Sequence, residues 1–347
     1  KSMKPNSQPI LCRVGPTGTG KSSLALQLAE AVKAEIVNFD SRQIYADFPC
    51  VTAQPSAQEQ ERCRHHLYGF LPTNESMDAG RFAGLARSVI QDIHSRGKLP
   101  ILVGGTGLYL RALIYGLAPI PDIPQETHDQ IMIECRILGP EVLHRRLQVE
   151  DPETAARLHP RDKQRITRAL EVRAETGRPL SWWIREYPCD TPRYSSLTLG
   201  LWVGLKELIP RLEARIEQMI ALGAMQEIER AWHRCPEENA SGWSGIGCWE
   251  LLQKFLGRWS WTEARQNWMK NTRAYAKRQL TWFKKEPGIY WLGHEDGNAV
   301  SSPWFQKSLD RVLKWNHDLQ LYTNDQTGVS FNGSRGGKPC IEQCDFG

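Results

Sequence analysis

The chain has 347 residues, of which 40% are hydrophobic and 24% are charged. This length predicts about two domains, and the composition excludes a disordered or fibrous protein. The 44 Lys and Arg residues against 39 Asp and Glu give a net charge of only +5. The placement of the basic residues should therefore matter more than their excess.

No segment is typical of an export signal or a membrane span. The longest apolar stretch, residues 101–120, contains Arg111, and a spanning helix needs about 20 residues without a central charge. The nine cysteines are scattered, and only Cys340 and Cys344 are closely spaced, without a second pair to complete a zinc site. We therefore expect reduced thiols, a cytoplasmic location and no membrane contact.

The first third of the chain alternates short apolar runs with helical stretches. This pattern predicts strands at residues 10–14, 35–39 and 99–103, and helices at residues 21–33 and 79–95. Strands that alternate with helices favour an α/β core in which helices flank a parallel β-sheet.

A helical region then interrupts the alternation. Three prolines between residues 119 and 124 break the chain, and residues 127–176 show helical periodicity without strand signals. An extended apolar run at residues 197–205 predicts a strand that rejoins the sheet. We expect the first part of the core at residues 8–120, an all-helical insertion at 121–194, the rest of the core with a helical C-terminal part at 195–316, and a flexible tail at 317–347.

Residues 15–22 read GPTGTGKS and match the phosphate-loop pattern G-x-x-x-x-G-K-[ST] between a predicted strand and a predicted helix. The glycines let backbone N–H groups converge on a phosphate, Lys21 adds a positive charge, and the Ser22 hydroxyl can ligate Mg²⁺. ATPases and GTPases usually place an acidic residue after a later strand, but here that strand is followed by the sequence GGT at residues 104–106. This absence argues against ordinary nucleotide hydrolysis and leaves open a diphosphate bound as a leaving group.

Two polar residues follow predicted strands, Asp40 and Thr106. The carboxyl ends of parallel strands meet at one edge of the sheet, where ligands bind. Asp40 could act there as a general base, ligate a metal through water or cap the following turn. Thr106 could donate a hydrogen bond to a developing oxyanion or serve as a turn residue.

Five motifs occur together in the order of one known family. They are GPTGTGKS at residues 15–22, DSRQIY at 40–45, LVGGTGLY at 102–109, HPRDKQRITRALEV at 159–172 and NTRAYAKRQLTWF at 271–283. The chain closely resembles the bacterial tRNA dimethylallyltransferases over roughly residues 10–292. The zinc-finger extension of eukaryotic relatives is absent from the sequence.

The resemblance implies transfer of a dimethylallyl group from dimethylallyl diphosphate to N6 of the adenosine on the 3′ side of the tRNA anticodon, with release of diphosphate. It implies Mg²⁺ as cofactor, with Ser22 as its protein ligand, and a monomer that binds the anticodon stem-loop. Asp40 is then the general base and Thr106 the hydroxyl that supports the departing oxygen. The implied diphosphate-binding residues are Gly15, Thr17, Gly18, Thr19, Gly20, Lys21, Ser22 and Arg215.

Basic residues cluster in two later segments. Residues 265–285 contain seven basic residues and no acidic one, interleaved with aromatic residues, and residues 161–173 contain five basic and two acidic residues. A solvated helix face over core aromatics is one interpretation, and a groove that contacts RNA phosphates is the other, which the two segments together favour. The resemblance implies tRNA contacts by Asp40, Ser41, Arg42, Gln43, Gln164, Arg165, Ile166, Thr167, Arg168, Lys277, Arg278, Gln279, Trp282 and Lys284.

Three other functions remain possible from the residues alone. A phosphate-loop kinase of a small molecule explains residues 15–22 but not the basic, aromatic C-terminal half. A prenyltransferase that acts on a free adenine nucleotide would share the donor site. An RNA-binding module with a vestigial phosphate loop would bind tRNA and alkylate nothing.

Overall fold

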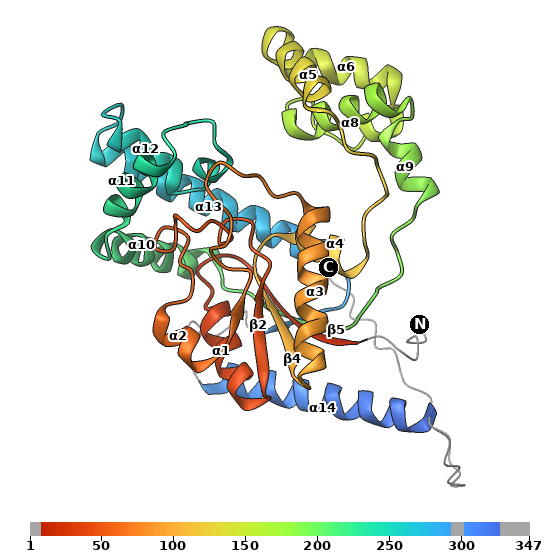
Figure 1. Cartoon of the computed structure of the whole chain (residues 1–347), viewed down its shortest axis with the longest axis vertical. Helices are drawn as coiled ribbons and strands as arrows, with labels where there is room; N and C mark the ends of the chain where they lie inside the picture. Colours follow the sequence, from red (N-terminus) through yellow and green to blue (C-terminus); the bar gives the residue numbers. More distant parts are fainter. Residues whose placement is uncertain (1–7, 293–301, 327–347) are drawn as a thin grey trace.

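The computed structural model describes residues 8–292 and 302–326, and its centre is a parallel β-sheet of six strands (Figure 1). The strands are β1 (Pro9–Val14), β2 (Ala34–Asn38), β3 (His65–His66), β4 (Leu99–Val103), β5 (Ser195–Leu201) and β6 (Ile289–Leu292). Their spatial order is β3-β2-β4-β1-β5-β6, and every neighbouring pair is parallel. The predicted α/β class is confirmed, whereas the short strands β3 and β6 were not predicted.

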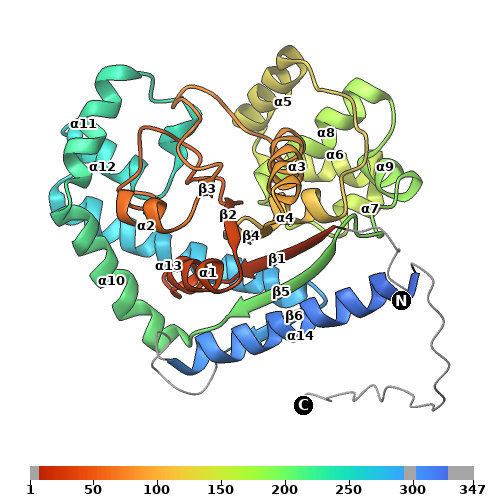
Figure 2. The same cartoon turned by 60° about the horizontal axis from the view of Figure 1, so that its bottom comes forward.

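Helices cover both faces of the sheet because alternate strand residues on each side are apolar. Helices α3 (Ala79–Ser95) and α4 (Gly107–Ile114) pack on one face, where Phe82 and Ile90 are fully buried. Helices α1 (Lys21–Ala31) and α14 (Ser302–Gln326) pack on the other face, and Figure 2 shows α14 running beneath the sheet. The sheet is thus the middle layer of three.

The C-terminal helix is longer than the sequence analysis indicates. Helix α14 continues to Gln326, ten residues into the segment that we predicted to be a tail from residue 317. Val312 packs in the core with Leu309 beside it, and a helix anchored in this way can propagate through a polar sequence. The remainder of the predicted tail, residues 327–347, lies outside the described residues together with Cys340 and Cys344.

Residues 125–186 form a helical unit that projects from the core on two extended connections (Figure 1). Its helices are α5 (Gln125–Leu138), α6 (Pro140–Glu150), α7 (Pro152–Ala155), α8 (Lys163–Thr176) and α9 (Leu180–Glu186). They enclose an apolar core that includes Ile131, Leu147 and Leu170. The buried Asp151 carboxylate accepts hydrogen bonds from Thr154 N and Ser181 N, which joins α7 to α9.

A third group of helices lies over the carboxyl ends of the strands. It contains α10 (Leu205–Ala221), α11 (Ala224–Arg234), the 3-10 turn η1 (Ser241–Ser244), α12 (Cys248–Phe255) and α13 (Trp261–Lys285). Its core includes Phe48, Ile228 and Trp243. Helix α2 (Ala57–Arg62) lies instead beside α1, where Arg62 pairs with Glu30 at 2.8 Å. Helix α13 starts at a capping box in which the Ser260 hydroxyl accepts from Glu263 N, and it ends with Phe283 packed against the sheet. Helix α13 therefore connects this group to the central sheet.

The structure bears on two expectations from the sequence, namely those about membrane-spanning helices and about the state of the cysteines. None of the helices in residues 8–292 and 302–326 is long and apolar enough to cross a bilayer. All seven cysteines in those ranges are free thiols.

Candidate active site

The phosphate loop joins β1 to α1 at the carboxyl edge of the sheet. Gly15 has a φ of +137°, and a Cβ at this position would lie 2.5 Å from the carbonyl oxygen of Leu201, so only glycine fits against β5. The Thr19 hydroxyl and the Lys21 ammonium group both donate to the carbonyl oxygen of Pro16, at 2.9 and 2.6 Å. The loop is thereby held in a compact curl with the Lys21 side chain folded over it.

Positive charge converges on this loop from two elements. Lys21 lies at the start of α1, and Arg215 on α10 lines the same cavity. Burial lowers the pKa of Lys21 to about 7, Asp40 opposes this shift, and the nearby Arg215 adds to it. Burial also lowers the pKa of Arg215. Two poorly hydrated cations beside a helix N-terminus make a strong site for an anion.

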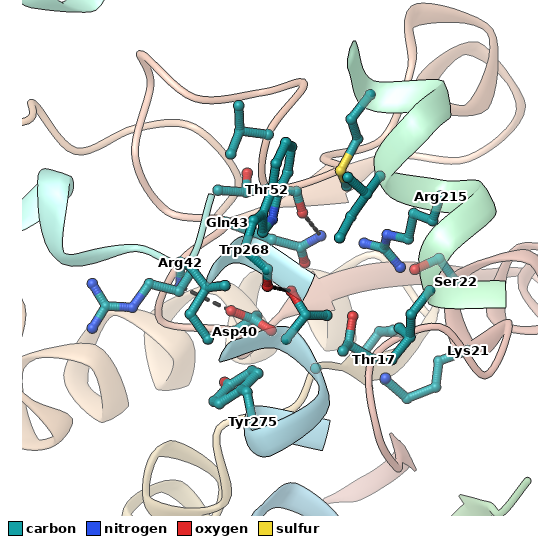
Figure 3. A pocket seen from close by; sticks show the side chains of 18 residues that line it. Thr17, Lys21, Ser22, Asp40, Arg42, Gln43, Thr52, Arg215, Trp268 and Tyr275 are labelled. Carbon is teal, nitrogen blue, oxygen red and sulfur yellow. Dashed lines mark hydrogen bonds between the residues drawn. The ribbon is translucent and has the colours of Figure 1, made fainter. Parts of the chain in front are cut away.

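Asp40 follows β2 and is held by hydrogen bonds on both sides. Its backbone N–H donates to Asn38 Oδ1 at 2.8 Å, and its Oδ1 accepts from Arg42 N at 2.8 Å, so the carboxylate caps the turn. The same side chain lines the cavity together with Lys21 and Ser22. Figure 3 shows Asp40 and the phosphate-loop side chains facing a common space. The Asp40 side chain therefore both caps the turn and lines the cavity.

The cavity has a volume of about 130 Å³, and its lining combines polar and apolar residues. The phosphate loop, Arg215 and Asp40 contribute polar groups. The apolar wall consists of Val51, Leu212, Ile216, Met219, Ile246 and Trp268. This apolar wall was not predicted from the sequence, because its residues come from a loop and from helices far apart in the chain and share no common pattern.

Thr106 lies behind the cavity rather than in its lining. Its hydroxyl oxygen accepts a hydrogen bond from Ser41 N at 2.9 Å and donates to the Ser41 hydroxyl at 3.2 Å. Thr106 therefore fixes the backbone directly after Asp40. Its role toward a departing oxygen stays a prediction.

Gln279 connects α13 to the phosphate loop. Its Oε1 accepts from Thr17 N at 2.9 Å and its Nε2 donates to the carbonyl oxygen of Gly105 at 3.1 Å. The side chain is 5% exposed, and a Cβ on Gly105 would lie 1.9 Å from Gln279 Nε2. This residue, which we predicted as a tRNA contact, thus lies in the interior, and glycine at position 105 makes the room for it.

The loop after Asp40 presents its polar residues in two directions. Gln43 Nε2 donates to the carbonyl oxygens of Thr52 and Ala53, and Gln43 lines the cavity. Arg42 Nη1 donates to Ser244 Oγ at 2.8 Å, and Figure 3 shows its guanidinium group extending away from the cavity. Arg42 is therefore placed to meet a large substrate at the rim.

The predicted RNA-binding segment on α8 is exposed only in part. The side chains of Gln164, Arg165 and Arg168 face solvent. Ile166 is fully buried in the core of the helical insertion, and Thr167 is 3% exposed and donates to carbonyl oxygens of its own helix. Ile166 and Thr167 therefore hold the helix in place, and their side chains are not offered to RNA in this structure.

The basic residues of α13 are also divided. Lys277, Arg278, Lys284 and Arg273 are all exposed, but Arg273 also pairs with Glu213 of α10 at 2.5 Å. The Lys284 ammonium group lies 3.6 Å from the centre of the Trp202 ring. Trp282 is half-buried against α4, where its Nε1 would clash with any Cβ on Gly107. Part of the expected basic stripe is thus engaged within the protein.

Few side chains among the described residues of the cavity could ligate a metal ion. Within the described ranges, no three His, Cys, Asp or Glu residues are grouped in a way that could hold a metal ion. Ser22 lies in the cavity lining beside Lys21 and across from Asp40. Mg²⁺ retains most of its water and needs few protein oxygens when phosphate oxygens complete its shell, so the residues present fit this ion.

Comparison with known proteins places the chain in a family. The family model described as IPP transferase matches residues 43–286. The tRNA dimethylallyltransferase of Oleidesulfovibrio alaskensis is 50% identical over 292 residues, which cover 84% of this chain and 95% of that protein. The tRNA dimethylallyltransferase of Maridesulfovibrio salexigens is 49% identical and covers 86% of this chain and 97% of its own length.

Solved structures agree with these relatives. A eukaryotic dimethylallyltransferase acting on tRNA has a TM-score of 0.75 and 30% identity, and covers 91% of this chain and 80% of that chain. The tRNA isopentenylpyrophosphate transferase of Bacillus halodurans has a TM-score of 0.65 and 29% identity, and covers 93% of this chain and 100% of that chain. This chain therefore belongs to the IPP transferase family, the prenyltransferases that include the tRNA dimethylallyltransferases.

Proposed function

We propose that the protein transfers a dimethylallyl group from dimethylallyl diphosphate to N6 of the adenosine 3′ to the anticodon of a tRNA. The single observation that carries this proposal is the shared cavity, which joins a phosphate loop, a carboxylate and an apolar wall. A kinase needs the first of these but has no use for an apolar wall beside the transferred group. An allylic diphosphate needs the loop and the wall, and its acceptor needs the carboxylate.

The polar and apolar parts of the cavity lining favour one orientation of dimethylallyl diphosphate. Its diphosphate would lie at residues 15–22, with Lys21 and Arg215 opposite its charge, and its five-carbon chain would lie along Leu212 and Met219. The C–O bond to the diphosphate breaks as the C–N bond forms, so negative charge accumulates on the leaving oxygen. Lys21 and Arg215, which already line the cavity, would stabilise this charge in the transition state more than in the ground state. Mg²⁺, held by Ser22, would supply further neutralisation of that charge.

Asp40 acts on the acceptor. The exocyclic amine of adenine is a weak nucleophile because its lone pair is delocalised into the ring, and the product amine must lose a proton as the new bond forms. The Asp40 oxygen that does not cap the turn is available to take that proton. The hydrogen bonds through Asn38 and Arg42 fix the direction of the carboxylate, so little reorganisation is required.

The tRNA would be held outside the cavity while one base enters it. A base inside a stacked loop cannot reach Asp40, so the adenine must leave its stack at a cost of a few kcal/mol. Exposed cations on α8 and α13, such as Arg165, Arg168 and Lys277, are placed to offset this cost through phosphate contacts. We further propose that the protein acts as a monomer and in the cytoplasm.

The proposal is tested by supplying one acceptor at a time with labelled dimethylallyl diphosphate and Mg²⁺. Label should enter unmodified tRNA, and AMP should remain unlabelled. Transfer to AMP at a comparable kcat/KM would favour the free-nucleotide enzyme. Rapid ADP formation from ATP with a small-molecule acceptor, without any prenyl transfer, would favour the kinase.

A further inference from the structure

Arg13 is a charged residue inside the sheet that the proposed reaction does not use. It lies in β1, two residues before Gly15, and is 0% exposed. In the described part of the chain, none of its three guanidinium nitrogens has a hydrogen-bond partner. A buried cation with all of its donors unpaired is unusual, because each unpaired donor carries a desolvation penalty.

The surroundings of Arg13 are apolar. Its cross-strand neighbours are Val103 on β4 and Leu199 on β5, and Leu11 precedes it on the same face of β1. All three belong to the core that packs against α1. Burial lowers the pKa of Arg13 to about 9, so the group remains charged at neutral pH. An apolar side chain would fit this position with less cost to stability.

The position of Arg13 relative to the phosphate loop suggests what the charge does. Val103, its neighbour on β4, lines the cavity, and the loop starts directly after β1. Arg13 faces the same side of the sheet as Val103, and α1, which begins at Lys21, packs against that side. Charges separated by protein rather than by water interact over longer distances and are screened little by salt. An anion bound by the loop would therefore be attracted by the Arg13 charge across the edge of the sheet.

We propose that Arg13 is a positioning residue for the diphosphate, a buried cation behind the phosphate loop that attracts the anion without touching it. The inference rests on the proposed function, because it takes the anion in the loop to be the diphosphate of the donor. The bound anion offsets the unfavourable burial of the guanidinium group. Anion binding should consequently stabilise the wild type more than a variant without this charge.

The test compares three variants by calorimetric titration with magnesium pyrophosphate and by thermal unfolding. In Arg13→Met the charge is removed, and in Arg13→Lys it is retained. Leu11→Met alters the same strand face without a change in charge. We expect Arg13→Met to unfold at an equal or higher temperature than wild type and to bind pyrophosphate about tenfold more weakly, or ~1.4 kcal/mol. Its KM for dimethylallyl diphosphate should rise while kcat is retained. The pyrophosphate affinity of Arg13→Lys should stay within about threefold of the wild-type value. The affinity of Leu11→Met should equal the wild-type value.

Several results would overturn the inference. Wild-type pyrophosphate affinity in Arg13→Met would show that the charge does not act on the anion. A folded Arg13→Lys that binds as weakly as Arg13→Met would assign the effect to side-chain shape. If Arg13→Met fails to fold, the pyrophosphate affinity of Arg13→Lys is compared with that of wild type. A loss of much more than about threefold would then overturn the inference. Dimethylallyl transfer to tRNA by the wild type is measured in parallel: if it is absent while pyrophosphate binding depends on Arg13, the donor assignment fails and the anion-holding role stands.

Discussion

Replacing Asp40 with Asn tests whether the cavity supplies a general base. Asp40 Oδ1 accepts from Arg42 N at 2.8 Å, and the amide oxygen of an asparagine accepts the same bond. The substitution therefore keeps the turn after β2 and removes the charge and the basic oxygen that faces the cavity. We expect the melting temperature to change by less than about 3 °C, because no buried contact is lost.

The expected loss of activity has two parts. General base catalysis contributes roughly 10²–10⁴ in rate, so kcat should fall by at least about 100-fold. Asp40 also raises the pKa of Lys21, which burial holds at about 7. Without the carboxylate a smaller fraction of Lys21 is charged at neutral pH, and the KM for the donor should rise by less than about tenfold.

Single-turnover kinetics at saturating tRNA and donor separate these effects, with tRNA affinity measured by fluorescence anisotropy. Asp47→Asn is a matched control, since Asp47 lies on the same loop and pairs with Arg234 outside the cavity. The control should retain kcat within about threefold. A wild-type rate in Asp40→Asn, or an equal loss in both variants, would refute the role of Asp40.

Three further perturbations follow from the geometry. Because the low pKa of Lys21, about 7, means that it loses its charge as the pH rises, the KM for dimethylallyl diphosphate should increase above pH 7 in wild type but not in Lys21→Arg; a parallel increase in both enzymes would exclude Lys21 as the source. Gln279→Ala leaves Thr17 N–H and the Gly105 carbonyl without their partner, so urea unfolding should show a loss of about 2 kcal/mol, and an unchanged midpoint would contradict the link between α13 and the loop. Thr106→Val removes the acceptor for Ser41 N and should lower kcat by about tenfold, whereas Thr106→Ser should retain activity; equal rates in the two variants would show that the hydroxyl is dispensable.

The sequence was most informative where local chemistry dictates structure. The glycines and Lys21 of the phosphate loop have few alternative conformations, and alternating strands and helices leave a parallel sheet as the simplest arrangement. Asp40 could be placed beside the loop because it ends a strand of that sheet. Only the coordinates show that the Asp40 side chain both caps the turn and lines the cavity, because a turn cap and a general base can be the same residue type.

The features that the sequence could not provide depend on distant partners. The sequence of a basic helix does not show which of its cations meet carboxylates, and Arg273 of α13 pairs with Glu213 of α10. Gln279 and Thr167 are polar residues in segments that we predicted to contact tRNA, yet both are buried because another element covers them. The burial of Arg13 depends on Val103 and Leu199, which flank it in the sheet but are distant from it in the sequence.

The most direct measurement is mass spectrometry of nucleosides from the anticodon loop of unmodified tRNA after incubation with the protein, dimethylallyl diphosphate and Mg²⁺. The account predicts one added dimethylallyl group on N6 of the adenosine 3′ to the anticodon, and almost none with Asp40→Asn. Unaltered adenosine in the presence of the folded wild-type protein, or a dimethylallyl group on another nucleoside, would contradict it.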